Sequence, residues 1–295
     1  MTPGQRTAIA QYLRTGEHDL LCLPWPGDVV TRSRHGAADL KDALVAEVNR
    51  RASRRPPPAP IAEVDLTDLT RRKVEPMVRG LFPRGEREAV LGLLARSVVV
   101  LTPATVGDVV RQARWLGTAW RLANLYLRSI GARPLGPGAP DLVGISEETT
   151  CWVSSEYFRP NGRFEDFVVH EAAHVFHNCK RRTAGLPETR CREWLLDIAF
   201  GKRETFAYAC EAYARIVELG ETRAARLALV EELAAGSRPS DERVDGDEYV
   251  DVLREAATAR NGWRCIFARC APPRRHRRAG GDALSVAPLQ GRAPS

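Results

Sequence analysis

Residues 164–177 read Phe164-Glu165-Asp166-Phe167-Val168-Val169-His170-Glu171-Ala172-Ala173-His174-Val175-Phe176-His177. Apolar residues recur along this stretch at helical period and over a broad surface, which is typical of a mostly buried α-helix. The turn residues Pro160-Asn161-Gly162 come just before it, so we expect the helix to begin near Arg163. Glu165 and Asp166 would then lie in the first turn, where negative charge complements the helix dipole. The stretch therefore predicts a core helix that carries several polar side chains.

Two histidines and a glutamate interrupt this apolar helix. His170 and His174 are four residues apart, so they share one helix face with their β-carbons about 5–6 Å apart. Two imidazoles at this spacing can bind a single zinc ion. Glu171 follows the first of them, where its carboxylate can accept a proton from a water that the metal activates. A core helix with two satisfied histidines is the alternative, but buried polar groups need partners. The H-E-x-x-H pattern thus predicts a zinc hydrolase site.

A zinc hydrolase needs a third protein ligand and an open position for water. His177 does not suit this role, because seven residues along a helix raise it about 10 Å above His170. The residues 203–219 have strong helical character, and Glu204, Tyr208 and Glu211 fall on one face of that helix. An acidic ligand from this second helix is the remaining route. In order of preference, the candidates for the third ligand are Glu204, Glu211 and Asp197.

The segment Glu204-Thr205-Phe206-Ala207-Tyr208-Ala209 carries a resemblance to a known family. It is similar to the Glu-x-Phe-Ala-x-Ala segment that supplies the third ligand in the anthrax-lethal-factor-like branch of the gluzincin zinc peptidases. The resemblance covers residues 164–217, and the thermolysin-type Asn-Glu-x-x-Ser-Asp version of the segment is missing. It implies a zincin-like zinc metallopeptidase with His170, His174 and Glu204 as ligands and Glu171 as general base. Glu211 would then support a ligand or form a structural ion pair.

Peptide hydrolysis also needs a second electrophile beside the metal to stabilise the developing oxyanion. Tyr208 is the residue that we assign to this role, with Tyr213 and His177 as alternatives, although either tyrosine could simply pack against the active-site helix. Zincins place an edge strand above the metal to hold an extended substrate. Residues 149–158 are β-branched and aromatic and predict a strand in the right place, and a plain sheet strand would have the same composition.

The composition is that of a globular protein with a basic excess. The net charge is +7, but the basic residues are 40 Arg and only 4 Lys, mostly scattered, and no nucleic-acid-binding motif accompanies them. We therefore do not expect nucleic acid as a partner. The seven cysteines contain no C-x-x-C pair, which argues against a second zinc site and for mostly reduced thiols. A disulfide involving Cys179, Cys191 or Cys210 is not expected.

The chain is expected to form a helix-rich α+β fold with a small sheet beside two active-site helices. We divide it into an N-terminal helical appendage (1–50), an Arg/Pro-rich linker (51–60), a zincin-like catalytic domain (61–268) and a disordered basic tail (271–295). No signal peptide or membrane span is evident, so the expected compartment is the cytoplasm. Strands are expected at 98–101 and 149–158. Helices are expected at 5–13, 37–49, 67–79, 84–96, 105–130, 163–180, 189–200, 203–219, 221–235 and 246–260.

Two functions from different classes fit these observations. The first is a zinc-dependent metallopeptidase that acts on a peptide or protein. The second is a zincin-like binding or regulatory module without peptidase activity, in which residues 1–50 dock on a protein partner. Glu171 favours the enzyme, because a purely structural metal site has no need of a base beside its ligand. Zinc is the expected metal, while two imidazoles and a carboxylate also suit cobalt, manganese or iron.

Overall fold

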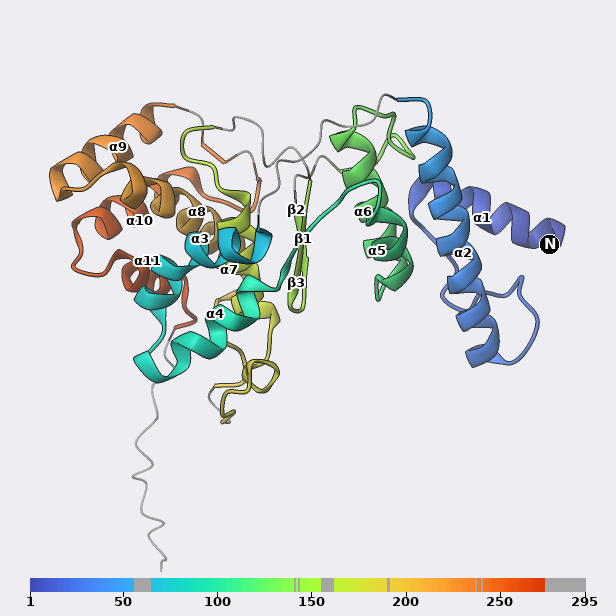
Figure 1. Cartoon of the computed structure of the whole chain (residues 1–295), viewed down its shortest axis with the longest axis horizontal. Helices are drawn as coiled ribbons and strands as arrows, with labels where there is room; N and C mark the ends of the chain where they lie inside the picture. Colours follow the sequence, from blue (N-terminus) through green and yellow to red (C-terminus); the bar gives the residue numbers. More distant parts are fainter. Residues whose placement is uncertain are drawn as a thin grey trace, which may run out of the picture.

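A computed structural model describes residues 1–55, 65–140, 142, 144–154, 162–189, 192–236, 238–239 and 241–273. The chain forms the helix-rich α+β fold that the sequence predicts, with its helices in two groups on either side of a small sheet (Figure 1). The helices are α1 (Pro3–Thr15), α2 (Val29–Ala52), α3 (Leu66–Leu81), α4 (Arg87–Ala95), α5 (Val106–Gln112), α6 (Leu116–Ser129), α7 (Phe167–Asn178), α8 (Arg203–Leu219), α9 (Arg223–Ala235), α10 (Gly246–Thr258) and α11 (Gly262–Cys270).

The sheet has three short strands, β1 (Val98–Val100), β2 (Gly144–Glu147) and β3 (Thr150–Val153), in the order β1-β3-β2. β1 runs parallel to β3, and β2 runs antiparallel to it. Because side chains alternate along a strand, β3 serves two cores. Cys151 and Val153 belong to the core on one side, whereas Trp152 packs against the core on the other.

The first core lies between the sheet and the helices α3, α4 and α7–α11. α7 is at its centre, and its side chains Val169, Val175 and Phe176 are completely buried. α8 packs directly against α7, and both helices contribute alanines to the shared core, whose small side chains allow a close approach of the backbones. α7 and α8 are thereby fixed side by side, with the predicted metal ligands facing each other.

The second core joins α1, α2, α5 and α6 with the segment 132–139 on the other side of the sheet. Leu40 and Leu44 of α2 pack with α6, and the hydroxyl of the buried Tyr12 donates a 2.7 Å hydrogen bond to the carbonyl of Leu116. The expected N-terminal appendage therefore packs on α5 and α6 of the same chain. The proposed domain boundaries stay a prediction, and residues 56–60 of the linker and 274–295 of the tail lie outside the described residues.

Several expected helices differ from those observed. The helix expected at 37–49 is α2, which begins already at Val29. α7 begins at Phe167, because Asp166 is its N-cap and accepts a 3.3 Å hydrogen bond from the Val169 amide. The expected helix 105–130 is two helices, α5 and α6, separated at residues 113–115. The expected helix 189–200 is wrong over residues 192–199, which form no helix. There the amides of Leu195 and Leu196 donate to carbonyls at the end of α7, whereas in a helix they would donate to the carbonyls four residues earlier.

No helix in the described ranges combines the length and the apolar character that crossing a bilayer requires. The six cysteines that the structure describes are free thiols, five of them buried, in agreement with the prediction; Cys191 lies outside the described residues.

Phe176 holds the active-site helix in the core, with its ring 5.3 Å from that of Phe82 and 6.5 Å from that of Phe206. We expect Phe176→Ala to lower the free energy of unfolding by about 3–5 kcal/mol, because it leaves a cavity between three helices. Phe200→Ala is the control, since Phe200 is 84% exposed and should change stability by less than about 0.5 kcal/mol. Urea unfolding followed by circular dichroism measures both. Equal effects would show that Phe176 does not anchor α7.

Candidate metal centre

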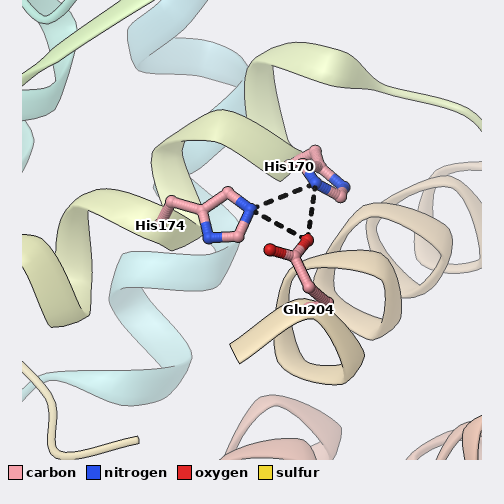
Figure 2. Close-up of side chains that lie close together, drawn as sticks. All are labelled: His170, His174 and Glu204. Carbon is pink, nitrogen blue, oxygen red and sulfur yellow. Dashed lines mark hydrogen bonds and ion pairs between the residues drawn. The ribbon is translucent and has the colours of Figure 1, made fainter. Parts of the chain in front are cut away.

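His170 and His174 of α7 and Glu204 of α8 converge on one point (Figure 2). The two Nε2 atoms are 3.2 Å apart. The Oε2 atom of Glu204 lies 3.4 Å from Nε2 of His174 and 3.9 Å from Nε2 of His170. All three side chains are at least four-fifths buried. The structure therefore brings together the three residues that the sequence predicts as metal ligands.

This triangle fits a zinc ion. Ligand atoms at about 2.0–2.1 Å from a tetrahedral metal are about 3.3 Å from one another, close to the separations of 3.2, 3.4 and 3.9 Å found here. Two imidazoles and a carboxylate also form a donor set that zinc accepts. Since a catalytic zinc takes three protein ligands and keeps a fourth position open, the described cluster has the composition of such a site.

Glu211 orients His170. Its Oε2 atom lies 3.0 Å from Nδ1 of His170, and its Oε1 atom accepts a 2.8 Å hydrogen bond from the backbone amide of Asp166. Because Nδ1 is engaged in this way, Nε2 is the nitrogen that faces the cluster. Burial lowers the pKa of His170, but Glu211 and the neighbouring carboxylates Glu171 and Glu204 raise it to about 9. At neutral pH the ring of His170 is therefore protonated, and its positive charge balances part of the negative charge of the three surrounding carboxylates.

His174 is oriented by a chain of neutral side chains. Its Nδ1 atom lies 3.0 Å from Nε2 of His177, and Nδ1 of His177 lies 3.0 Å from Oδ1 of Asn178. The amide oxygen of Asn178 can only accept, so Nδ1 of His177 carries its proton and Nε2 accepts from His174. Burial, with smaller effects of His174 and Arg203, lowers the pKa of His177 to about 3, in keeping with this neutral role. His177 is thus a partner of a ligand and not itself a ligand, as the spacing predicts.

Glu204 is held from both sides. Its Oε1 atom forms a 2.9 Å ion pair with Arg243, which also pairs with Asp241 at 2.6 Å, while Oε2 faces the histidines. Burial raises the pKa of Glu204. The hydrogen bond from His174 and the charge of Arg243 together lower this pKa by more than burial raises it, so the net shift is downward. An ionised carboxylate with one oxygen directed at two imidazoles is suited to bind a metal.

Glu171 of α7 lies against β2 and lines the same pocket as the three candidate ligands. The gap is so narrow that a β-carbon added to Gly144 would lie 2.6 Å from Oε1 of Glu171. Burial raises the pKa of Glu171, although His170, His174 and the hydroxyl of Ser146 counteract this rise. A buried carboxylate beside the ligands with a raised pKa is suited to receive a proton and release it again.

The cluster opens into a pocket of about 480 Å³ whose walls come from both helix groups. Residues Gly144–Ser146 of β2 form one wall, and Phe200, Arg203 and the 241–243 loop lie around the opening, with Arg121 of α6 reaching it from the other group. The expected substrate-holding role of strand 149–158 is wrong for its described part. β3 (Thr150–Val153) is the central strand, so both of its edges are already paired. Residues 155–158 lie outside the described residues.

The remaining sequence candidates, two tyrosines and an aspartate, differ in whether they line this pocket. Tyr208 lines the pocket with its ring 4.5 Å from that of His170, and burial raises its pKa to about 12. Tyr213 packs on Trp263 at 4.9 Å and is not among the residues that line the pocket. Asp197 is exposed and lines a different surface pocket, so it is wrong as a ligand.

Several residues around the site carry no signal in the sequence that identifies them. Gly144 and Ser146 belong to a strand of four residues that the sequence does not predict, and Arg243 lies in a loop far along the chain. Asn178 is the exception, because an amide directly after the histidine-rich helix is a visible candidate for pairing with His177.

Comparison of the chain with protein-family models, curated proteins and solved structures gave no match.

Glu211→Gln tests the orientation of His170. An amide offers one oxygen where the carboxylate serves two donors, His170 and the Asp166 amide, so we expect zinc affinity to fall by about 10–100-fold. Glu218→Gln, a change of the same kind at an exposed position of α8, should leave zinc affinity unchanged. Competition with a chromophoric chelator measures both variants. Wild-type affinity in Glu211→Gln would show that His170 needs no such partner.

Proposed function

We propose that this protein is a zinc-dependent metallopeptidase that hydrolyses peptide bonds. The convergence of His170, His174 and Glu204 at the floor of an open pocket carries the proposal. Glu171 adds to it, because a base beside the ligands serves hydrolysis and not structure. The resemblance of residues 164–217 to the gluzincin peptidases points the same way.

The roles of the side chains follow from their positions. A zinc ion held here would polarise the scissile carbonyl and lower the pKa of a water toward about 7. Glu171 would take the proton of the attacking water and deliver it to the leaving amine. Tyr208, with a pKa of about 12, keeps its proton at neutral pH and can donate a hydrogen bond to the developing oxyanion.

The edge strand β2 offers a place for the substrate backbone. Within the described residues it pairs only with β3, and its residues Gly144, Ile145 and Ser146 line the pocket beside Glu171. An extended peptide can add to such an edge through main-chain hydrogen bonds. We therefore assign to β2 the substrate-holding role that the sequence suggests for the next strand.

Metal content and cleavage, measured together, test the proposal. Elemental analysis of the purified wild type should give one zinc per chain, and His170→Ala and Glu204→Ala should lose it. Glu171→Gln should keep the zinc while cleavage of a quenched fluorescent peptide library falls by about 10²–10⁴-fold, because only the base is removed.

Each other outcome has a definite meaning. A wild type that folds without binding zinc contradicts the metal site. Zinc retained in Glu204→Ala contradicts Glu204 as the third ligand. A zinc-loaded wild type that cleaves no member of the library contradicts the peptidase and favours the zincin-like binding or regulatory module.

Gly144→Ala tests the position of the general base without removing it. The added methyl group collides with the Glu171 carboxylate, so we expect cleavage to fall by about 10²-fold while zinc content stays at one per chain. Gly201→Ala is the matched control, since Gly201 lines the same pocket but a β-carbon there meets nothing within 4 Å. Equal activities of the two variants would show that Glu171 is not confined by β2.

A further inference from the structure

A second pocket, of about 840 Å³, lies in the other helix group and is lined mainly by arginine. Seven of its twelve lining residues are Arg, contributed by the ends of α1, α2 and α6 and by the loop after α6. The other five are small or apolar, so none of the twelve is acidic or aromatic. We call this site the arginine pocket; its arginines are Arg14, Arg50, Arg51, Arg54, Arg55, Arg128 and Arg133.

The walls of the arginine pocket are anchored to the second core. The buried side chain of Asn124 accepts a 2.8 Å hydrogen bond from the amide of Leu135 in the loop. Arg51 donates to the carbonyls of Arg133 and Pro134 in the same loop. Gly136 passes so close to the carbonyl of Arg14 that only glycine fits there. The pocket is therefore held in shape by buried contacts and is not a chance gathering of mobile side chains.

The positive charge exceeds what the local structure needs. Arginines favour helix C-termini, and three such ends meet here, each equivalent to about −0.5 charge. Glu47, paired with Arg50 and Arg51 at 2.6 Å, supplies one further negative charge. Even without counting Arg128, the other six guanidinium groups leave an excess of about three positive charges. Among the described residues, no carboxylate lies within 4 Å of Arg14, Arg54, Arg55 or Arg133.

We propose that the arginine pocket binds a compact ligand that carries several phosphate groups. Guanidinium groups match the oxygens of phosphate with paired, charge-assisted hydrogen bonds. The pocket volume lies in the range of small-molecule sites, about 300–1,000 Å³. No aromatic side chain lines it, so it lacks the platform on which the bases of a single-stranded nucleic acid stack. Ligand binding here is independent of the metal centre and of the proposed peptidase activity.

Isothermal titration of the full chain with inorganic triphosphate tests the arginine pocket. We expect Arg54→Gln with Arg55→Gln to weaken binding at least about tenfold, because both guanidinium groups face the ligand without a described acidic partner. The matched control is Arg223→Gln with Arg260→Gln, which removes the same charge from exposed positions elsewhere. It should change affinity less than about twofold if the pocket is the site. Arg133→Gln, a single exposed change, replaces the pocket variant if that variant does not fold.

Zinc and nucleic acid need controls of their own. Triphosphate also binds zinc, so the titration is repeated with His170→Ala, where the affinity should be unchanged. Three results would overturn the proposal: no heat of binding with the wild type, equal loss in the pocket and control variants, or loss of binding in His170→Ala. Binding of a twelve-nucleotide single strand to the pocket without binding of triphosphate would also overturn it, in favour of nucleic acid.

Discussion

The carboxylate of Glu211 is the contact on which the arrangement of the metal centre depends. It lies on α8 and is buried, and its two oxygens meet the backbone amide that precedes α7 and the ring of His170. One side chain thus fixes where the active-site helix begins relative to its neighbour and which nitrogen of the first histidine faces the cluster. Because the alanine-rich contact brings the two helix backbones close, Glu204 on α8 can reach both histidines. Packing and chemistry share the same interface.

The small sheet separates two cores, and the pocket of the candidate metal centre has walls from the helix groups of both. Cys151 and Val153 face one core and Trp152 faces the other, so β3 contacts both helix groups and connects them. β2 is carried on the same sheet and brings Gly144 against Glu171. α6 reaches from the metal pocket to the arginine pocket: Arg121 lines the first, and Arg128, two turns later on the same face, lines the second. A ligand in one pocket and a substrate in the other would therefore contact the same helix.

The charges of the two pockets are opposite in kind. The candidate metal centre gathers Glu171, Glu204 and Glu211 around two histidines, a set of charges that suits a cation. The arginine pocket gathers guanidinium groups at helix ends, which makes it a site for an anion. The net charge of +7 conceals this separation, because a sum over the chain contains no information on where the charges lie.

The sequence by itself determined which three residues converge at the candidate metal centre and which helices carry two of them on one face, because the periodicity that buries α7 also places His170 and His174 together. The sequence also showed that His177 lies too far along the helix to be a ligand. It predicted the span of α8, which is observed as expected at Arg203–Leu219. Only the tertiary structure decided the partners of the ligands, the edge strand and the arginine pocket. Glu211, Asn178 and Arg243 matter through distances between elements, and β2 is too short to show a pattern. The error at 189–200 has the same cause, since its backbone hydrogen bonds go to α7, a choice that local propensity does not encode.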